Sequence, residues 1–478
     1  MAALSRVASA RYVFATFKVE NAESYTQETW QEDIASAKAT GIDGFDCQSQ
    51  STDWQFDRIR DAFDVAESQH FQLFHSFDMS YHSRTANCPT GKAWNETFMA
   101  SVLSTANTSS AAYRWNGHLL VSTYEGELYG DGFFTTLKDD LSGAGVSISL
   151  APALTSYSEA ATESGTPSTS ANQAFSEYTS IDGFFNAFAW PYNVDRNLSC
   201  AVDAAFSTAV QTANRSGPFI MAVSPWLFQD LDTGNPADSF VQYSDTLWYY
   251  RWYEAINDVQ PDIITIISWN DYISSNYIRD LPPATGAGSV SLGSQENYVA
   301  GVNHTAWRTL AQYYITYYKS ANGTAPEIVN NDLVYWYRIH SKSSPCAGGT
   351  GSASVPVRNA RFPADAVFIY AAVRANSLVE VYFGTNPTTR SPRPGTPRLT
   401  FDTTNQTEPW LFRLPFPPDF PRNASDRLFP QIVVDPEDIA YAKYDSVPIT
   451  AECAWENFNP VVQSLGSDFD AVIFEERE

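Results

Sequence analysis

The stretch IITIISWNDYISSNY, residues 263–277, decides the fold assignment. It opens with a run of β-branched and apolar residues, which predicts a strand buried on both faces, as in a parallel sheet. The run ends in Trp269, Asn270, Asp271 and Tyr272, and in parallel α/β proteins the functional side chains lie at the carboxyl ends of the strands. A carboxylate beside an indole, a phenol and an amide is typical of a site that cleaves sugars. A loop that closes a barrel, with Trp269 as its plug, would explain the same residues.

Strand and helix patterns alternate from Tyr12 to about Lys319. The predicted strands cover residues 12–16, 43–48, 72–77, 119–123, 146–151, 183–189, 219–224 and 263–268. The predicted helices that follow them cover residues 27–40, 54–68, 94–106, 133–141, 172–178, 201–213, 247–259 and 307–319. Such repeated units predict a (β/α)8 barrel. A doubly wound open sheet is the alternative, but the first strand-to-helix turn, KVENAESY, has no glycine fingerprint for phosphates.

The pattern changes after Gly-Thr-Ala-Pro at 323–326. Segments such as LVYWYRI, AVFIYAAV, LVEVYFG and PWLFRLPF then alternate with Pro, Gly and Asn turns, as in an antiparallel sandwich. We therefore predict an α/β fold in which residues 1–324 form a TIM barrel that carries the catalytic site. Residues 325–478 would form a C-terminal antiparallel β-sandwich. The Ser/Thr-rich segment 155–170 is expected to be a surface loop.

Composition narrows the class of partner. The formal net charge is -25, so the surface would repel phosphate, and we expect neither nucleic acid nor an anionic membrane as a partner. A neutral polymer would not be repelled. Aromatic residues make up 14% of the chain, with 13 Trp and 26 Tyr, and we expect many of these rings to line a groove. No Cys or His spacing suggests a metal site, and we expect no cofactor.

The density of sequons indicates a secreted eukaryotic protein. Asn-X-Ser/Thr sequons occur at Asn95, Asn107, Asn197, Asn214, Asn303, Asn322, Asn405 and Asn423, which is a dense set. Residues 1–10 contain too short an apolar run for a signal peptide, so we expect that a natural leader has been trimmed. Cys47 falls in a predicted core strand and is expected to be a free thiol. Cys88 with Cys200 and Cys346 with Cys453 are candidate disulfides, and the sequence leaves other pairings open.

Carboxylates and indoles dominate the residues that follow the predicted strands. These residues are Thr16, Lys18, Gln48, Asp53, Trp54, Asp78, Thr123, Tyr124, Glu125, Glu127, Trp190, Tyr192, Pro225, Trp226, Phe228, Trp269, Asn270 and Asp271. No Ser-His-Asp set, zinc triad or Gly-rich cradle occurs among them. Glycoside hydrolysis needs two carboxyl groups, one to protonate the leaving oxygen and one to activate water or attack carbon, together with rings that hold the sugar.

Each of these residues also has a structural interpretation. Asp53 could be the N-cap of the second helix, and Asp78 an acceptor for backbone donors. Glu127 could be a solvated loop residue, and Trp190 and Trp226 could pack a lid. If the barrel is correct, however, all of them converge on one end of it, where a purely structural set is a poorer explanation.

Several long segments resemble the fungal α-1,3-glucanases (mutanases) of glycoside hydrolase family 71. They are FATFKVEN, DIASAKATGIDGF, FQLFHSFDM, VSTYEGE, GFFNAFAWP, MAVSPWLF and YSDTLWYYRWYEAINDVQPDIITIISWNDY. The resemblance implies a secreted, glycosylated hydrolase of the fungal cell wall. Its substrate would be the polysaccharide α-1,3-glucan, cleaved with inversion at the anomeric carbon. We expect a monomer without cofactor or metal.

The resemblance also implies site residues. The family's essential aspartate in W-N-D-Y falls on Asp271, its strand-2 aspartate on Asp53, and the glutamate of its strand-4 loop on Glu127. These are the candidate catalytic residues. The candidate substrate-binding residues at the same end are Trp190, Trp226, Trp269, Asn270, Asp78, Tyr272 and Tyr277.

The chain departs from the family pattern at this end. Ser274 stands where the family has an essential glutamate and Asn276 where it has a histidine. Thr16 replaces a histidine and Glu20 a glycine, and A-L-N-I-G has become the run 46–50, DCQSQ. A serine cannot serve as general acid or base near neutral pH, and losing such a group costs roughly 10²- to 10⁴-fold in rate.

Three interpretations follow from these departures. A working hydrolase could use Glu127, Asp53, Asp46 or Glu20 in place of the missing carboxylate, or act on a different substrate. A glucan-binding protein could keep the stacking tryptophans without activity. A wall-associated structural or interaction protein could keep the fold alone.

Overall fold

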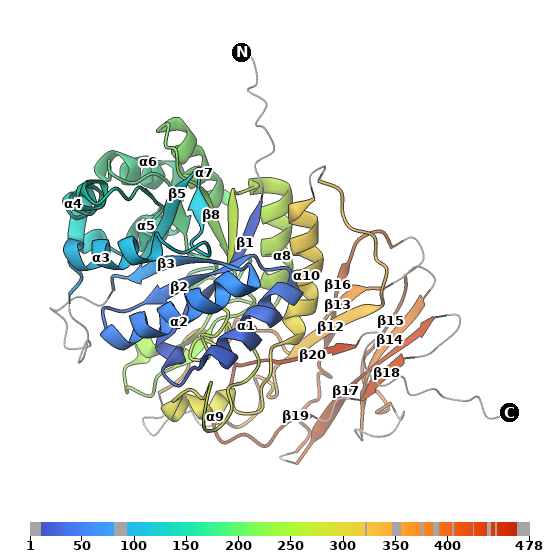
Figure 1. Cartoon of the computed structure of the whole chain (residues 1–478). Coiled ribbons are helices and arrows are strands. Elements are labelled where there is room, and N and C mark those ends of the chain that lie inside the picture. Colours follow the sequence, from blue (N-terminus) through green and yellow to red (C-terminus); the bar gives the residue numbers. More distant parts are fainter. Residues whose placement is uncertain are drawn as a thin grey trace.

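A curled, almost entirely parallel sheet forms the centre of the N-terminal part of the chain (Figure 1). The computed structural model describes residues 11–80, 93–320, 323–346, 355–373, 377–385, 392–403, 406–423, 425–436, 441–444 and 447–465. The parallel strands are β1 (Tyr12–Lys18), β2 (Gly44–Ser49), β3 (Gln72–Asp78), β5 (His118–Tyr124), β6 (Ile148–Leu150), β7 (Phe184–Asn186), β8 (Phe219–Val223) and β11 (Ile263–Ile266). Only β4 (Arg114–Trp115), on the edge of β5, is antiparallel among the described strands of this sheet.

The sheet curls until its two end strands approach each other. The strand order is β6-β5-β3-β2-β1-β11-β8-β7. The backbone N–H groups of Gly183 and Phe185 donate to the carbonyls of Leu150 and Pro152, over 3.0 Å each, and so join the β7 side to the β6 side. This arrangement is consistent with a TIM-type barrel, and each predicted strand overlaps one of these parallel strands.

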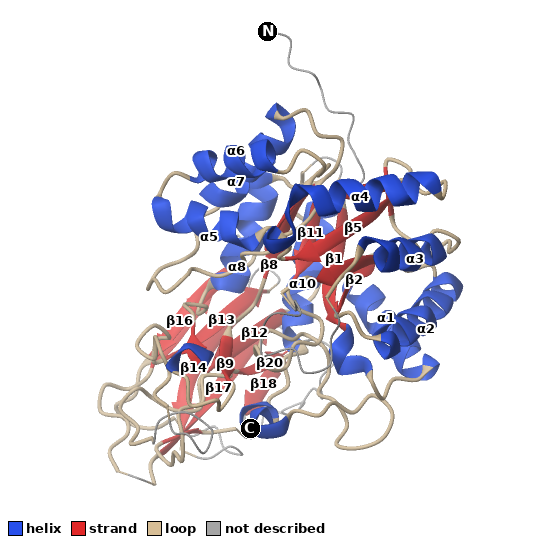
Figure 2. Ribbon diagram, turned by 90° about the vertical axis from the view of Figure 1, so that its left-hand side faces the viewer, coloured by secondary structure: helices blue, strands red, loops and turns tan. Residues whose placement is uncertain are grey.

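Helices cover the outer face of the sheet (Figure 2). They are α1 (Gln27–Thr40), α2 (Asp53–Gln69), α3 (Glu96–Ala106), α4 (Gly130–Gly143), α5 (Thr155–Ser164), α6 (Pro167–Glu177), α7 (Ala201–Thr212), α8 (Leu247–Glu254) and α10 (Ala306–Lys319), with a π-helical turn at Ala255–Val259. The short helix α9 (Glu296–Val299) lies in the connection between β11 and α10. In α1, Thr26 caps the first turn by accepting from the Thr29 N–H, and Gly41 ends the helix at φ 94°. Between the caps, Trp30, Ile34 and Ala37 recur at helical spacing and are buried, so this stripe holds α1 on the sheet.

The predicted surface loop 155–170 is wrong, because α5 and α6 occupy it. Ser156, at the start of α5, donates its backbone N–H to the Glu127 carboxylate over 2.8 Å, which satisfies one of the unpaired donors of the first turn. Pro167 occupies the first position of α6, where its missing N–H costs nothing. A prediction from serine and threonine content alone was therefore wrong for this helical segment.

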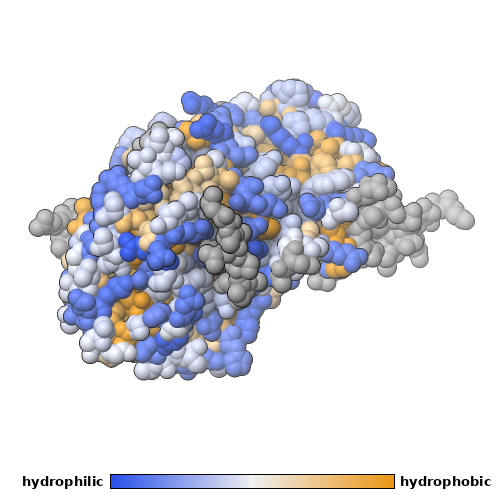
Figure 3. All heavy atoms as spheres, turned by 90° about the horizontal axis from the view of Figure 1, so that it is seen from above, coloured by the Kyte–Doolittle hydropathy of each residue, from blue (hydrophilic) through white to orange (hydrophobic). Residues whose placement is uncertain are grey.

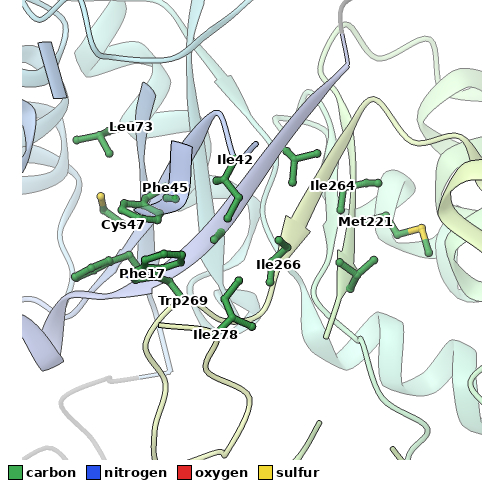
Figure 4. Close-up of a cluster of buried hydrophobic side chains, with 14 of the residues drawn as sticks. Phe17, Ile42, Phe45, Cys47, Leu73, Met221, Ile264, Ile266, Trp269 and Ile278 are labelled. Atoms are coloured by element: carbon green, nitrogen blue, oxygen red, sulfur yellow. The ribbon is translucent and has the colours of Figure 1, made fainter. Parts of the chain in front are cut away.

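Strand β2 shows how the sheet separates core from site. It begins at Gly44, where a Cβ would lie 2.2 Å from the Gln72 carbonyl oxygen, so only glycine fits this close approach. Phe45 and Cys47 belong to the buried cluster between sheet and helices (Figure 4). Because side chains alternate along a strand, Asp46 lies on the other face, which encloses the interior of the curled sheet. The register of β2 with β1 places Asp46 directly beside Thr16.

The C-terminal region consists of antiparallel sheets. One contains, in order, β16 (Trp410–Pro415), β13 (Ala366–Ala372), β12 (Asp332–Tyr337) and β20 (Val461–Leu465). The other contains β15 (Arg398–Asp402), β14 (Ser377–Gly384), β17 (Arg427–Pro436) and β18 (Tyr441–Tyr444), with β19 (Ile449–Thr450) beside β17. Leu333, Tyr335 and Ile369 of the first sheet share one apolar cluster with Val381 and Ile432 of the second, so these two sheets pack face to face. A further antiparallel pair, β9 (Phe228–Asp230) with β10 (Ser239–Val241), follows β8 in the chain and forms a separate two-stranded sheet.

Strands β12 and β13 of the first C-terminal sheet are buried on both faces, because the other face of these strands packs on the helices of the curled sheet. Trp336 donates its indole N–H to the Asp245 carbonyl over 2.9 Å, and the rings of Tyr370 and Tyr314 lie 6.1 Å apart. Trp226 likewise donates to the Phe458 carbonyl over 2.8 Å. This contact explains why β12 and β13 read as continuous apolar runs rather than as alternating strands.

The predicted disulfide between Cys346 and Cys453 is confirmed, and Cys47 is a buried free thiol as predicted. Cys88 lies outside the described residues, so its pairing with Cys200 stays a prediction. None of the described helices is both long and apolar enough to cross a membrane. The face of the molecule in Figure 3 carries mainly hydrophilic residues, and its hydrophobic residues form separate patches.

Candidate active site

A cavity of about 310 Å³ opens at the carboxyl ends of the parallel strands. Its walls come from β1, β2, β3, β5, β7 and the loops after β7, β8 and β11. The lining residues are Thr16, Lys18, Asp46, Gln48, Ser76, Tyr124, Thr155, Phe185, Ala187, Phe188, Trp190, Leu227, Gln229, Phe240, Ile267, Asp271, Ser274 and Asn276. The cavity therefore lies at the end of the sheet where α/β barrels carry their active sites.

Asp271 enters this cavity on a loop that is fixed by its own hydrogen bonds. The Asp271 N–H donates to the Ser268 hydroxyl over 2.7 Å, and the Ser274 N–H donates to Asp271 Oδ1 over 3.1 Å. Ser268 in turn donates to the Asn276 side-chain oxygen over 2.7 Å. Asn270 accepts from the Lys18 N–H over 2.7 Å and fastens the loop to β1. These contacts hold the carboxylate in one place relative to β1.

Asp46 is the second carboxyl group that lines the cavity. It is 1% exposed, and its Oδ2 accepts a hydrogen bond from the Thr16 hydroxyl over 2.9 Å. Its Oδ1 has no hydrogen-bond partner among the described residues. Burial raises the pKa of Asp46 to about 7, against the opposing effects of the Thr16 hydrogen bond and the Lys18 ammonium.

Lys18 supplies a positive charge between the acidic groups. Burial would lower the pKa of this ammonium, but the carboxylates of Asp271, Glu20 and Asp78 outweigh that effect and raise it. Lys18 Nζ lies 4.0 Å from Glu20 Oε1, and Gln50 donates to Glu20 Oε2 over 2.6 Å. Lys18 is therefore protonated at neutral pH.

Aromatic rings form one wall of the cavity. Trp190 and Phe188 line it from the loop after β7, and Tyr124 lines it from the end of β5 with 37% of its surface exposed. The Trp190 indole N–H donates to the Trp226 carbonyl over 3.0 Å, which fixes the ring. A sugar ring can lie on such a face while the polar groups around it bind its hydroxyls.

The other acidic residues predicted for the site do not line this cavity. Asp53 is the exposed first residue of α2 and lines a separate groove with residues of α2 and α3. The Glu127 carboxylate accepts from the Ser156 N–H and hydroxyl over 2.8 and 2.9 Å, as the cap of α5 described above. Asp78 is buried and accepts from Gln48 over 3.0 Å, so it stands behind the cavity wall.

Glu125 is a further acidic group close to the cavity. Burial, followed by the nearby carboxylates of Glu127 and Asp78, raises the pKa of Glu125 to about 7. It follows Tyr124 in a backbone conformation with φ 58°, and it does not line the cavity either.

Most of the predicted aromatic residues are buried in the core instead. Trp226 is 1% exposed, and Trp269 packs with Phe45, 5.3 Å between ring centroids, in the cluster of Figure 4. Tyr272 donates to the Asp280 carbonyl over 2.9 Å, and Tyr277 stacks on His304 at 4.1 Å. The Asn270 side chain likewise bonds to the backbone of β1, where it accepts from the Lys18 N–H and donates to the Lys18 carbonyl. The expectation that the predicted residues meet at one end of the barrel therefore applies to Asp271 and Trp190 but not to these residues. A position after a strand does not determine the direction of a side chain.

The sequence list of strand ends omitted Asp46, because it lies inside β2 rather than after it. The sequence named Asp46 only as one of four possible replacements for the missing carboxylate. The signal that singles it out is an acid within an otherwise buried strand, GFDCQS at 44–49. A buried carboxylate is costly unless something compensates or uses it.

Comparison with known proteins identifies the family. The family model of glycosyl hydrolase family 71 matches residues 9–405. A glucan endo-1,3-alpha-glucosidase of Schizosaccharomyces pombe is 33% identical over 399 residues, 82% of this chain and 84% of that protein. A mutanase of Penicillium rubens is 29% identical over 389 residues, 80% of this chain and 77% of that protein. An ascus wall endo-1,3-alpha-glucanase of S. pombe is 26% identical over 355 residues, 72% of this chain and 75% of that protein. The chain belongs to glycosyl hydrolase family 71 and is a glycoside hydrolase.

Proposed function

We propose that this protein hydrolyses the α-1,3-glucosidic bonds of α-1,3-glucan in the cavity at the carboxyl ends of its parallel strands. The relatives described above are named as a glucan endo-1,3-alpha-glucosidase, a mutanase and an endo-1,3-alpha-glucanase. The observation that carries the proposal is that Asp271 and a second carboxyl group line one cavity together with Trp190 and Tyr124. Acids and stacking rings in one cavity are what glycoside hydrolysis requires.

In the proposed reaction, Asp271 acts as general base and the anomeric carbon is inverted. Its carboxylate takes a proton from a water molecule whose oxygen bonds to C1 as the bond from C1 to the leaving oxygen breaks. Inversion requires room for this water, so the two carboxyl groups should stand about 6.5 to 9.5 Å apart. The Trp190 ring would hold the sugar, and Tyr124 would face it from β5.

The rest of the chain is proposed to support this activity. Residues 1–324 would form a (β/α)8 barrel and residues 325–478 a β-sandwich packed against it. We place the protein outside the cell or in the fungal cell wall, as a monomeric glycoprotein, because a mutanase and an ascus wall glucanase are among its relatives. The sequons at Asn95, Asn197, Asn214, Asn303 and Asn423 lie on exposed residues, which is compatible with glycosylation.

The test is release of reducing sugar from alkali-insoluble α-1,3-glucan. Wild-type protein should release sugar whose anomeric configuration, followed by NMR, is initially inverted. Asp271→Asn should lower the rate by roughly 10²- to 10⁴-fold while retaining binding to the polymer in a pull-down. Asp57→Asn is the matched control, because Asp57 lies on α2 outside the cavity and pairs with Arg60.

A glucan-binding protein without activity is the second candidate. It is favoured by Ser274 in place of the family's glutamate and by the absence of Asp53 and Glu127 from the cavity lining. Retention of the polymer by wild-type protein without release of sugar would support this alternative. Neither retention nor release would leave a structural role for the fold.

A further inference from the structure

We propose that Asp46 is the general acid of this site and protonates the leaving O3 oxygen. The family resemblance suggests no catalytic residue at this position. The assignment rests on the proposed function, because it supplies the second carboxyl group of the same reaction. It also replaces Asp53 and Glu127, the candidates that the sequence favoured.

The first argument is position. Asp46 lies on the face of β2 that encloses the interior, and the apolar residues Phe14, Phe74 and Phe185 pack within the same curled sheet. Thr16 occupies one of its oxygens, and the other is buried without a partner among the described residues. Leaving a buried carboxyl oxygen unpaired costs free energy. A bound sugar oxygen at the cavity wall would give that oxygen its partner.

The second argument is that polar side chains at and beside the cavity are joined by hydrogen bonds. Thr16 bonds to Asp46 at 2.9 Å, and Gln50 bonds to Glu20 at 2.6 Å. Ser274 and Asn276, which stand in place of the family's glutamate and histidine, line the cavity that Asp46 also lines. These contacts hold Asp46 and its neighbours in fixed positions at the cavity wall.

The third argument concerns protonation. The charged and titratable groups around Asp46 are Lys18 on β1 with Glu20 beside it, Cys47 on β2, Asp78 on β3 behind Gln48, Tyr124 on β5, and Asp271 on the loop after β11. Of these, only the Lys18 ammonium stabilises the charged form of Asp46, and burial outweighs it. With a pKa of about 7, Asp46 carries its proton under mildly acidic conditions, as a general acid must.

The step balances without another reactant. Asp46 gives its proton to O3 of the departing glucosyl unit as the C1–O3 bond breaks, while Asp271 takes a proton from the attacking water. The bond between C1 and the water oxygen forms with inversion. Asp46 ends as a carboxylate and Asp271 as a carboxylic acid, and exchange with solvent restores both.

The experiment compares two substrates whose leaving groups differ in their need for a proton. One is α-1,3-glucan, and the other is the α-fluoride of an α-1,3-linked glucose oligosaccharide, from which fluoride leaves without a general acid. Asp46→Asn should lower kcat on glucan by roughly 10²- to 10⁴-fold and change the rate on the fluoride by less than tenfold. Asp271→Asn should lower both rates, and Asp57→Asn should change neither. Melting curves will show whether each variant is folded.

Four outcomes would overturn the assignment. If Asp46→Asn is as active as an active wild type, Asp46 takes no part in the reaction. A folded Asp46→Asn that loses both substrates to the same extent shows that protonation of the leaving group is not its role. If Asp53→Asn, Glu127→Gln or Glu125→Gln, rather than Asp46→Asn, loses activity on glucan but keeps it on the fluoride, that residue is the general acid. A wild type that releases nothing from either substrate would overturn the proposed function as well, and this outcome differs from the others.

Discussion

The hydroxyl of Thr16 donates a hydrogen bond to Asp46 over 2.9 Å, at adjacent positions of β1 and β2 inside the cavity that also contains Asp271. Burial disfavours the charged form of Asp46, whereas this contact and the Lys18 ammonium favour it, and the pKa of Asp46 is about 7 as a result. The balance among these effects sets the pH range over which Asp46 carries a proton.

Removing this hydrogen bond should shift the pH dependence of the reaction. Thr16→Val deletes a donor to the carboxylate, so the pKa of Asp46 should rise, by about one unit for a hydrogen bond to a charged group. Activity that needs protonated Asp46 falls as the pH rises through that pKa, so the alkaline limb of the kcat profile should move to higher pH. Thr135→Val, on the exposed surface of α4, is the control. An alkaline limb that stays in place or moves to lower pH would contradict the role of Thr16.

Asp46 should also affect folding stability as a function of pH. Its pKa is raised from 3.8 to about 7 in the fold, so between these values the unfolded chain has lost a proton that the native state keeps. The contribution of Asp46 to the free energy of unfolding therefore falls as the pH rises, and above pH 7 the full cost, a few kcal/mol, is present. Asp46→Asn should be more stable than wild type at pH 8, with the difference shrinking toward pH 4. Urea unfolding at several pH values measures this, and a pH-independent difference would argue against a buried, neutral Asp46.

A carboxyl group at position 274 should rescue the loss of Asp46. Ser274 lines the cavity, and its N–H bonds to Asp271, so a glutamate there would lie close to Asp271. Two nearby carboxylates raise the pKa of one of them, which would create a new acid. The double variant Asp46→Asn, Ser274→Glu should regain at least about tenfold of the activity of Asp46→Asn on glucan. Ser274→Gln in the same background is the control, because glutamine has the size of glutamate but no acidic proton. Equal recovery by that variant would refute the interpretation.

Trp190 and Trp226 should respond differently to truncation. Trp190→Ala removes a ring from the cavity wall and should raise KM about tenfold with a smaller effect on kcat. Trp226 is 1% exposed and packs under the C-terminal region, so Trp226→Ala should lower the free energy of unfolding by about 3–5 kcal/mol. Trp410→Ala, 37% exposed on β16, should change neither quantity. A normal KM for Trp190→Ala would remove this ring from sugar binding.

The C-terminal region should be required for a stable fold. Trp336 and Tyr370 cover residues of the helices around the curled sheet, and the Trp226 indole finds its acceptor on Phe458. A chain that ends at residue 324 would expose this apolar surface and leave buried donors unpaired. We expect it to melt at a lower temperature than the full chain or to aggregate, as measured by circular dichroism and light scattering. An unchanged melting temperature would show that the two parts are independent.

The order of strands and helices could be predicted because it depends on local patterns. The β-branched run at 263–267 and the stripe of Trp30, Ile34 and Ala37 carry their periods in the sequence itself. The segment 155–170 was the exception. Its serines and threonines suggested a loop, whereas a carboxylate far away in the chain, Glu127, caps the helix that forms there.

The sequence by itself determined the family, the alternation of strands and helices, and the presence of Asp271 and Trp190 at the carboxyl ends of strands. Only the tertiary structure decided which side chains share a cavity. The curl of the sheet turns Asp46 inward, and the packing of the C-terminal region encloses Trp226. Asp53 and Glu127 stay outside because a helix start and a helix cap hold them. The physical reason is that the direction of a side chain at a strand end is set by contacts between residues far apart in the chain, which no local pattern records.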